Sequence, residues 1–198
     1  MARIELEEGN DSFDCVIGKG LYAPRIASAA GAFSLAAYAH SRLALREFEA
    51  ARIRIAQING CQICQTWRSL RDARVYLEKA HVDPTDTFVS RGEPPDEGFY
   101  SEVANWRSSP VFSQRERIAV EYADRFALDH LSLQTDEALW KNMHLHFSDD
   151  EIVDLTLCIG AWIAMGRFAQ VLGIDGVCAL PSTNHIHASA GPRQQPNC

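Results

Sequence analysis

The feature that most constrains the fold of this chain is residues 49–68, whose pattern predicts a helix, a tight turn and a second helix. Apolar residues before the turn recur every three or four positions, as on one buried helical face: Leu45, Phe48, Ala51, Ile55 and Ile58. Asn59 and Gly60 then supply the left-handed residue with which many helices end. We therefore expect a helix hairpin near the centre of the fold.

Helical patterns also dominate the rest of the chain. Residues 26–40 are uncharged and rich in alanine, which indicates a helix buried on several sides. Ser113 with Glu116, and Ser148 with Glu151, form capping boxes that open two further helices. No alternation of apolar and polar residues persists, so we expect essentially no sheet. The predicted fold class is all-α.

The length of 198 residues suits one well-buried domain and is short for two. We expect an acidic N-terminal arm at 1–19 that packs Phe13 or Ile17 onto a neighbour. The helical domain is predicted to cover 20–178. Residues 179–198 contain three prolines and are predicted to form an irregular tail.

Charge and composition exclude several classes of function. The formal net charge of −7 argues against nucleic acid or an anionic membrane surface as the main partner. Six cysteines are too few for a disulfide-dense secreted scaffold of this length. Residues 1–14 lack the apolar core of a signal peptide, and the uncharged stretch 155–166 is too short to span a bilayer. We expect a cytoplasmic protein.

The second helix of the hairpin begins with Cys61 and Cys64, spaced as Cys-x-x-Cys, and is predicted to continue to about Ala80. In the first turn of a helix, free backbone N–H groups and the macrodipole favour an anion. Such a position can lower a thiol pKa from about 8.5 to roughly 3.5–7.5. Residues three apart share a helical face, so the two thiols can also join as a disulfide. This pattern indicates a redox centre.

Two other interpretations of the cysteine pair remain open. It could be half of a zinc site, although no second Cys-x-x-Cys follows. The remaining ligands would have to come from His144 and His146, which diverge on a helix, or from His185 and His187. Alternatively, both cysteines could be inert members of the core.

The segment from Glu49 to Arg68 resembles the signature of the carboxymuconolactone decarboxylase / alkyl hydroperoxidase AhpD-like superfamily. That signature has a glutamate twelve residues before the first cysteine of Cys-x-x-Cys, and a histidine four residues after the second. Glu49, Cys61 and Cys64 match it, whereas Arg68 stands in the place of the histidine. The resemblance extends over roughly residues 20–175 and includes 112–117 and 146–156.

The resemblance implies a single AhpD-like helical domain that acts as a thiol-dependent peroxidase or disulfide oxidoreductase. Cys64 would attack a small hydroperoxide or other small-molecule substrate, and Cys61 would resolve the product as a disulfide. A thiol or lipoyl-type electron donor would restore the pair. The resemblance also implies a homotrimer or hexamer. We expect no cofactor and no metal.

Arg68 is the one clear departure from the signature. At 1.5 Å per residue along two antiparallel helices, Glu49 lies too far from the turn to touch Cys64. A histidine at position 68 could pass a proton between them, but an arginine keeps its proton. We hypothesise that Arg68 pairs with Glu49 and stabilises the Cys64 thiolate. The predicted catalytic residues are therefore Cys64, Cys61, Glu49 and Arg68, while a merely solvated Arg68 is the alternative.

Two other functions remain open at this stage. One is a cofactor-free decarboxylase of the carboxymuconolactone type, a branch that does not typically need Cys-x-x-Cys. The other is a non-enzymatic redox sensor, which the loss of the histidine favours. In addition, residues 82–98 are rich in proline and glycine, and we expect them to form a loop over the entrance to the site.

Overall fold

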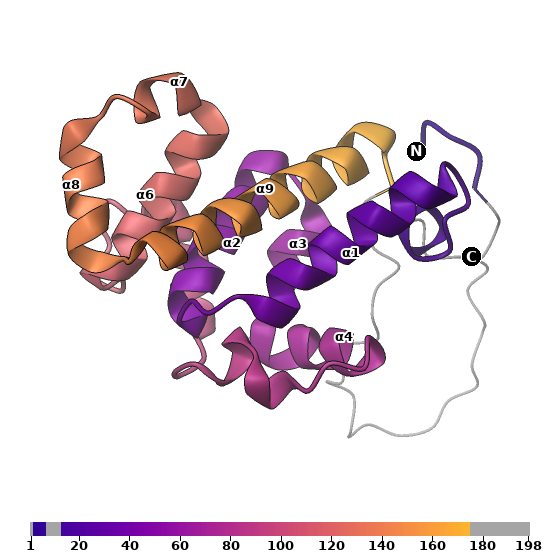
Figure 1. The fold of residues 1–198 in the computed structure, drawn as a ribbon, viewed down its shortest axis with the longest axis horizontal. Helices are drawn as coiled ribbons and strands as arrows, with labels where there is room; N and C mark the ends of the chain where they lie inside the picture. Colours follow the sequence, from indigo (N-terminus) through magenta and orange to yellow (C-terminus); the bar gives the residue numbers. More distant parts are fainter. Residues whose placement is uncertain (1, 7–12, 175–198) are drawn as a thin grey trace, which may run out of the picture.

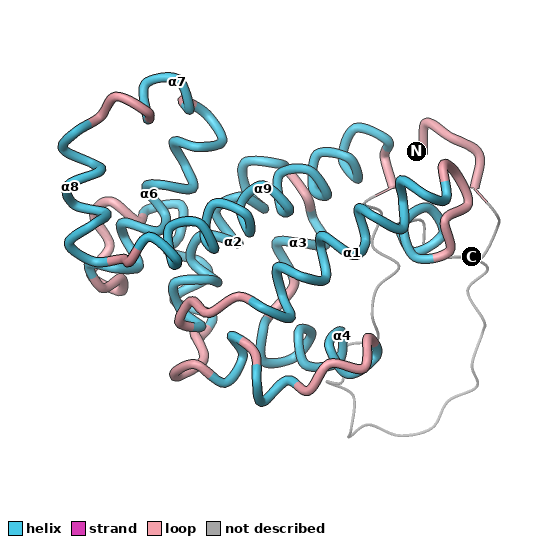
Figure 2. The backbone as a smooth tube through the Cα atoms, in the orientation of Figure 1, coloured by secondary structure: helices cyan, strands magenta, loops and turns pink. Residues whose placement is uncertain are grey.

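The computed structural model describes residues 2–6 and 13–174, and every regular element in them is helical (Figure 2). The predicted all-α fold is therefore confirmed, whereas the predicted tail at 179–198 lies outside the described residues. The longer helices are α1 (Pro24–His40), α2 (Leu45–Asn59), α6 (Gln114–Leu128), α8 (Glu137–His146) and α9 (Asp149–Leu172). The short elements are η1 (Asp14–Gly18), α3 (Gln62–Thr66), η2 (Ser69–Ala73), α4 (Arg74–Lys79), η3 (Pro84–Asp86), η4 (Phe88–Ser90), α5 (Glu97–Glu102), η5 (Val103–Asn105) and α7 (His130–Leu133).

Helix α2 is the centre of the fold. It packs against α6 and α9, and α1 lies along α9 (Figure 1). Both predicted capping boxes are confirmed, since Ser113 caps α6 and Ser148 caps α9. Helices α6, α7 and α8 lie together at one end of the molecule. Every helix with an apolar face thus buries it against α2 or against a neighbour of α2.

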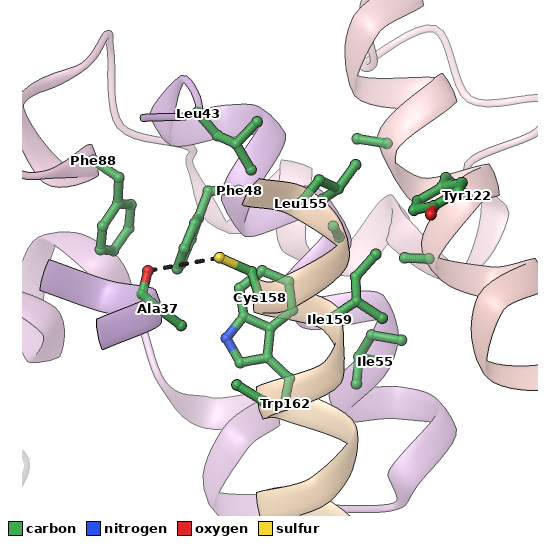
Figure 3. Packing of buried hydrophobic residues seen from close by; sticks show 14 of the residues in the cluster. Ala37, Leu43, Phe48, Ile55, Phe88, Tyr122, Leu155, Cys158, Ile159 and Trp162 are labelled. Carbon is green, nitrogen blue, oxygen red and sulfur yellow. Dashed lines mark hydrogen bonds between the residues drawn. The ribbon is translucent and has the colours of Figure 1, made fainter. Parts of the chain in front are cut away.

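The main core lies between α1, α2, α6 and α9 (Figure 3). Phe48 of α2 stacks on Phe88, and Trp162 of α9 meets the same Phe48 ring edge-on. Leu155 and Cys158 are also buried. Helix α9 is long and apolar enough to cross a membrane by length and composition, and 44% of its apolar window is buried inside the fold. It serves here as the core helix of the domain.

A close contact between α2 and α9 holds the turn that precedes the cysteines. Asn59 donates a hydrogen bond to the Trp162 carbonyl at 3.0 Å and accepts one from Arg167 at 3.2 Å. A Cβ atom at Gly166 would lie 2.4 Å from the Asn59 amide nitrogen, so only glycine allows this approach. Gly60 follows with a φ of 67° and ends α2. Cys61 is therefore held in place by contacts on both helices.

The second helix of the hairpin is much shorter than predicted. A single helix from Cys61 to about Ala80 was expected, but α3 ends at Thr66 because Trp67 and Arg68 are extended, with ψ values of 139° and 130°. Asp72 then accepts a hydrogen bond from the Arg68 amide at 2.8 Å, and the chain resumes as η2 and α4. Local periodicity could not reveal this break, since the groups that hold it come from α2.

The N-terminal residues pack on their own chain. The turn η1 lies against α1, and Phe13 packs on the small cluster formed by Val16, Ala169 and Ile174. Further upstream, the Arg3 amide donates a hydrogen bond to the carbonyl of Leu172 at the end of α9. The neighbour on which Phe13 packs is therefore α9 of the same chain, which supplies the apolar surface it needs.

Candidate redox site

Cys61 and Cys64 are joined by a disulfide, with their Cα atoms 5.3 Å apart. Cys61 is the N-cap of α3, and its sulfur accepts a hydrogen bond from the Cys64 amide at 3.3 Å. The predicted disulfide is thus formed at the N-terminus of a helix. Among the described residues no group of three His, Cys, Asp or Glu side chains could hold a metal, so the zinc alternative finds no ligand set there.

The two sulfurs are not equivalent. Cys61 is 1% exposed, whereas Cys64 is only partly buried and packs on the apolar cluster beneath α5. A reagent from outside therefore reaches Cys64 first. The amide hydrogen bond, in contrast, stabilises negative charge on Cys61 when the S–S bond breaks. Its exposure suits Cys64 to react with an incoming reagent. The hydrogen bond suits Cys61 to leave as a thiolate when the disulfide is reduced.

Glu49 and Arg52 form a buried ion pair beside the disulfide. Arg52 Nε lies 2.6 Å from Glu49 Oε1, and Arg52 Nη2 lies 3.0 Å from Glu49 Oε2. Both side chains are at most 2% exposed. Burial alone would lower the pKa of Arg52, but the Glu49 carboxylate outweighs it and raises that pKa, so the guanidinium stays charged.

The Arg52 guanidinium also donates hydrogen bonds to the backbone at and after Cys64. Arg52 Nη1 donates to the Cys64 carbonyl at 2.7 Å, and Nη2 donates to the Trp67 carbonyl at 3.0 Å. Carbonyl groups at the end of a helix have no partner within that helix. Arg52 supplies hydrogen-bond donors to these carbonyls, which favours the end of α3 at this point. Glu49 thus acts on Cys64 through Arg52.

Tyr100 completes the network from α5. Its hydroxyl donates a hydrogen bond of 2.6 Å to Glu49 Oε2. Burial and the nearby Glu49 carboxylate both raise the pKa of Tyr100, so the hydroxyl keeps its proton. Both carboxylate oxygens of Glu49 therefore already accept hydrogen bonds from within the protein. Glu49 is placed to hold Arg52 rather than to accept a proton from a thiol.

The predicted Arg68–Glu49 pair is not formed. Arg68 instead makes a two-pronged ion pair with Glu97 of α5, at 2.8 and 2.9 Å, and lies over the Tyr100 ring at 4.1 Å. It also donates to the carbonyls of Gln65 and Trp67. The Arg68 guanidinium lowers the pKa of the Glu97 carboxyl. The hypothesis of an Arg68–Glu49 pair is wrong because the buried Arg52 side chain makes the ion pair with Glu49.

A cavity of about 690 Å³ opens beside the disulfide. Cys61, Cys64 and Arg52 line it, and the other walls come from η1, α1, α4 and α9. No residue of 82–98 lines it, so the expected loop over the entrance is wrong. That segment instead forms two short helical turns, and Phe88 is buried in the main core.

The other described cysteines, Cys15 and Cys158, are buried and free. The Cys158 thiol lies 3.3 Å from an Asp154 oxygen. Burial, and secondarily the Asp154 charge, raise the pKa of Cys158 well above its usual value. Cys158 therefore stays protonated and unreactive at neutral pH, as expected of a small buried core residue.

Two members of the site, Arg52 and Tyr100, were missed from the sequence. Arg52 lies three residues after Glu49, and such a pair on a helix is usually an exposed ion pair. The available signal was its position between Ala51 and Ile53, both buried. A charge pair inside so apolar a helix face has to be buried and paired. Tyr100 left no comparable signal.

Comparisons with known proteins place the fold. No family model matches the chain. The uncharacterized protein YnjA of Escherichia coli (strain K12) is 36% identical over 115 residues, which are 57% of this chain and 62% of YnjA, so the match spans less than two thirds of that relative. A solved structure, ATU0492 from Agrobacterium tumefaciens, is named as a protein of unknown function and candidate antioxidant defence protein AhpD. It is 23% identical, with a TM-score of 0.57 over 79% of this chain and 94% of ATU0492. The chain therefore has an AhpD-like fold.

Proposed function

We propose that this chain, which has an AhpD-like fold, is a thiol-dependent peroxidase or disulfide oxidoreductase. The observation that carries the proposal is the Cys61–Cys64 disulfide, with one buried and one accessible sulfur, at the edge of a large cavity. Catalysis would depend on Cys64 and Cys61 directly, and on Glu49 and Arg52 as positioning residues. A pair that cycles in this way suits a reducing, cytoplasmic setting.

The proposed reaction needs only the two thiols, a hydroperoxide and a dithiol donor. The Cys64 thiolate attacks the terminal peroxide oxygen, the O–O bond breaks, and the departing alkoxide takes a proton from solvent to become an alcohol. Cys64 is then a sulfenic acid. The Cys61 thiol attacks the Cys64 sulfur, water leaves, and the disulfide forms. A small thiol or lipoyl-type dithiol returns two electrons and two protons and is itself oxidised to a disulfide.

A non-enzymatic redox sensor is the second candidate, and one observation favours it. Both Glu49 oxygens are occupied by Arg52 and Tyr100, so no nearby carboxylate is free to take the Cys64 proton. The number of turnovers separates the two functions. We expect the protein to reduce many equivalents of hydroperoxide when a dithiol is present. Consumption that stops at one equivalent despite excess dithiol would identify a sensor.

We expect Arg68→Ala to make Cys64 less acidic. In the reduced protein the Arg68 cation would help to stabilise a Cys64 thiolate near the end of α3, and an alanine cannot. The pH midpoint of iodoacetamide labelling at Cys64, followed by mass spectrometry, should therefore move upward. Arg71→Ala is the matched control, because the Arg71 side chain is 61% exposed and bonds to its neighbour Asp72 and to the Thr66 carbonyl. Equal midpoints in wild type and Arg68→Ala would remove Arg68 from the site.

We also propose that the protein is a homo-oligomer, a trimer or hexamer. Several large apolar side chains of α1 and α9 are exposed, among them Ile26 (74%), Leu157 (54%) and Val171 (73%). Large exposed apolar patches mark subunit interfaces. Sedimentation should give a multiple of the 22.1 kDa chain mass, and Leu157→Glu should shift it to the monomer. A wild-type monomer at all concentrations would rule out the assembly.

A further inference from the structure

The cavity beside the disulfide has the size and lining of a small-molecule site. Its volume of about 690 Å³ lies within the roughly 300–1,000 Å³ typical of ligand pockets. Small residues on the inner walls, among them Gly31, Ala32 and Ala56, leave this space open. A small hydroperoxide such as hydrogen peroxide would leave most of it unfilled. The cavity therefore suits a much larger substrate.

Several aromatic side chains line the cavity. Tyr38 meets Trp67 edge-on with ring centroids 4.7 Å apart, and it meets Tyr76 in the same manner at 5.6 Å. Trp162 and Phe13 also line the cavity. Rings that present edges and faces at several angles suit a second ring placed among them. A flexible alkyl chain would gain less from this wall, because it cannot stack.

One polar group in this wall lacks a partner within the described residues. The Trp162 indole nitrogen is buried, and no described atom accepts its hydrogen bond. Figure 3 shows this nitrogen on the side of the ring that faces Ala37 of α1, next in sequence to Tyr38. Because this nitrogen has almost no accessible surface, it lies in the packing between α9 and α1, and what Trp162 presents to the cavity is its ring. Burial also raises the pKa of Tyr38, whose hydroxyl stays neutral.

We propose that this cavity binds an aromatic organic hydroperoxide, with its ring among Tyr38, Trp67 and Trp162 and its oxygens near Cys64. This substrate class rests on the proposed peroxidase function. The chemistry is that of the general reaction: Cys64 takes the terminal oxygen, the aromatic alcohol leaves with a solvent proton, and Cys61 closes the disulfide with loss of water. The added claim is selection for a ring over a linear chain.

Binding can be measured without turnover, using the oxidised protein and alcohols that cannot react. Cumyl alcohol and nonanol have the same number of carbon atoms, and tryptophan fluorescence reports their binding. We expect cumyl alcohol to bind about tenfold more tightly, the size of effect that a favourable aromatic contact supplies. Equal or tighter binding of nonanol would overturn the selection for a ring.

Two variants locate the ligand. Ala32→Leu adds bulk on the cavity face of α1 and should weaken cumyl alcohol binding about tenfold or more. Ala138→Leu, at an exposed position on α8, is the control and should bind as wild type does. Trp162→Leu removes one of the rings that line the cavity, so cumyl alcohol should lose most of its advantage over nonanol. Unchanged binding in Ala32→Leu would overturn the site.

Turnover then separates this inference from the proposed function. If the function holds, kcat/KM for cumene hydroperoxide should exceed that for nonyl hydroperoxide by about the same tenfold factor. Tight cumyl alcohol binding without turnover of any hydroperoxide would reject the peroxidase and leave an aromatic-binding cavity. Turnover with no preference for the aromatic substrate would reject the inference alone.

Discussion

Cys64→Ser is expected to reduce hydroperoxide turnover to the rate of the dithiol donor alone. The accessible sulfur is Cys64, and a serine hydroxyl at that position is a poor nucleophile at neutral pH. The loss should be complete, because Cys61 is 1% exposed and held behind it. The measurement is peroxide consumption in the presence of dithiol, with Cys158→Ser as a control that keeps its activity because Cys158 is unreactive.

Cys61→Ser tests whether Cys61 is the resolving thiol and Cys64 the nucleophile. This variant should react once, remain oxidised at Cys64, and accumulate as a sulfenic acid or a mixed disulfide with the donor. Mass spectrometry of the modified peptide identifies the sulfur. Modification of Cys61 in Cys64→Ser, together with an inert Cys64 in Cys61→Ser, would reverse the two roles.

Arg52→Met is expected to destabilise the protein by about 3–5 kcal/mol, because it leaves the Glu49 carboxylate buried without its partner. The carbonyls of Cys64 and Trp67 lose their donor in the same step. Urea unfolding followed by circular dichroism measures the free energy of unfolding. Few single substitutions cost as much, so the effect is well outside experimental error.

The double variant Glu49→Leu/Arg52→Met distinguishes a buried pair from an ordinary packing defect. Removing both charges should cost less than Arg52→Met alone, because no unpaired charge remains inside. Arg71→Met provides a surface control, since the Arg71 side chain is 61% exposed and its ion pair with Asp72 should contribute about 1 kcal/mol or less. Additive losses for Glu49→Leu and Arg52→Met would show that the two side chains act independently.

The parts of the fold that depend on local sequence were predictable. The helix before Asn59, the stop at Gly60 and the capping boxes at Ser113 and Ser148 are set by residues within a turn of one another. The position of the cysteine pair at a helix N-terminus follows from the same rules. Each of these features has its cause and its effect within a few residues.

Features set by distant residues were not predictable in the same way. Arg68 appeared to be the natural partner of Glu49 because helix spacing placed it between Glu49 and Cys64. Its actual partner, Glu97, comes from a helix 29 residues further along the chain. The end of α3 has a similar cause, since an arginine on α2 binds its carbonyls. The periodicity of apolar residues indicates which face of a helix is buried. It does not identify the ion-pair partners of charged residues on other helices.

The attachment of α3 has a consequence for how the centre works. Arg52 binds main-chain oxygens and makes no bond to either sulfur. Reduction of the disulfide therefore removes the covalent bond between Cys61 and Cys64 but leaves the hydrogen bonds from Arg52 to α3 in place. We therefore expect α3 to stay attached to α2 through Arg52 when the pair is reduced.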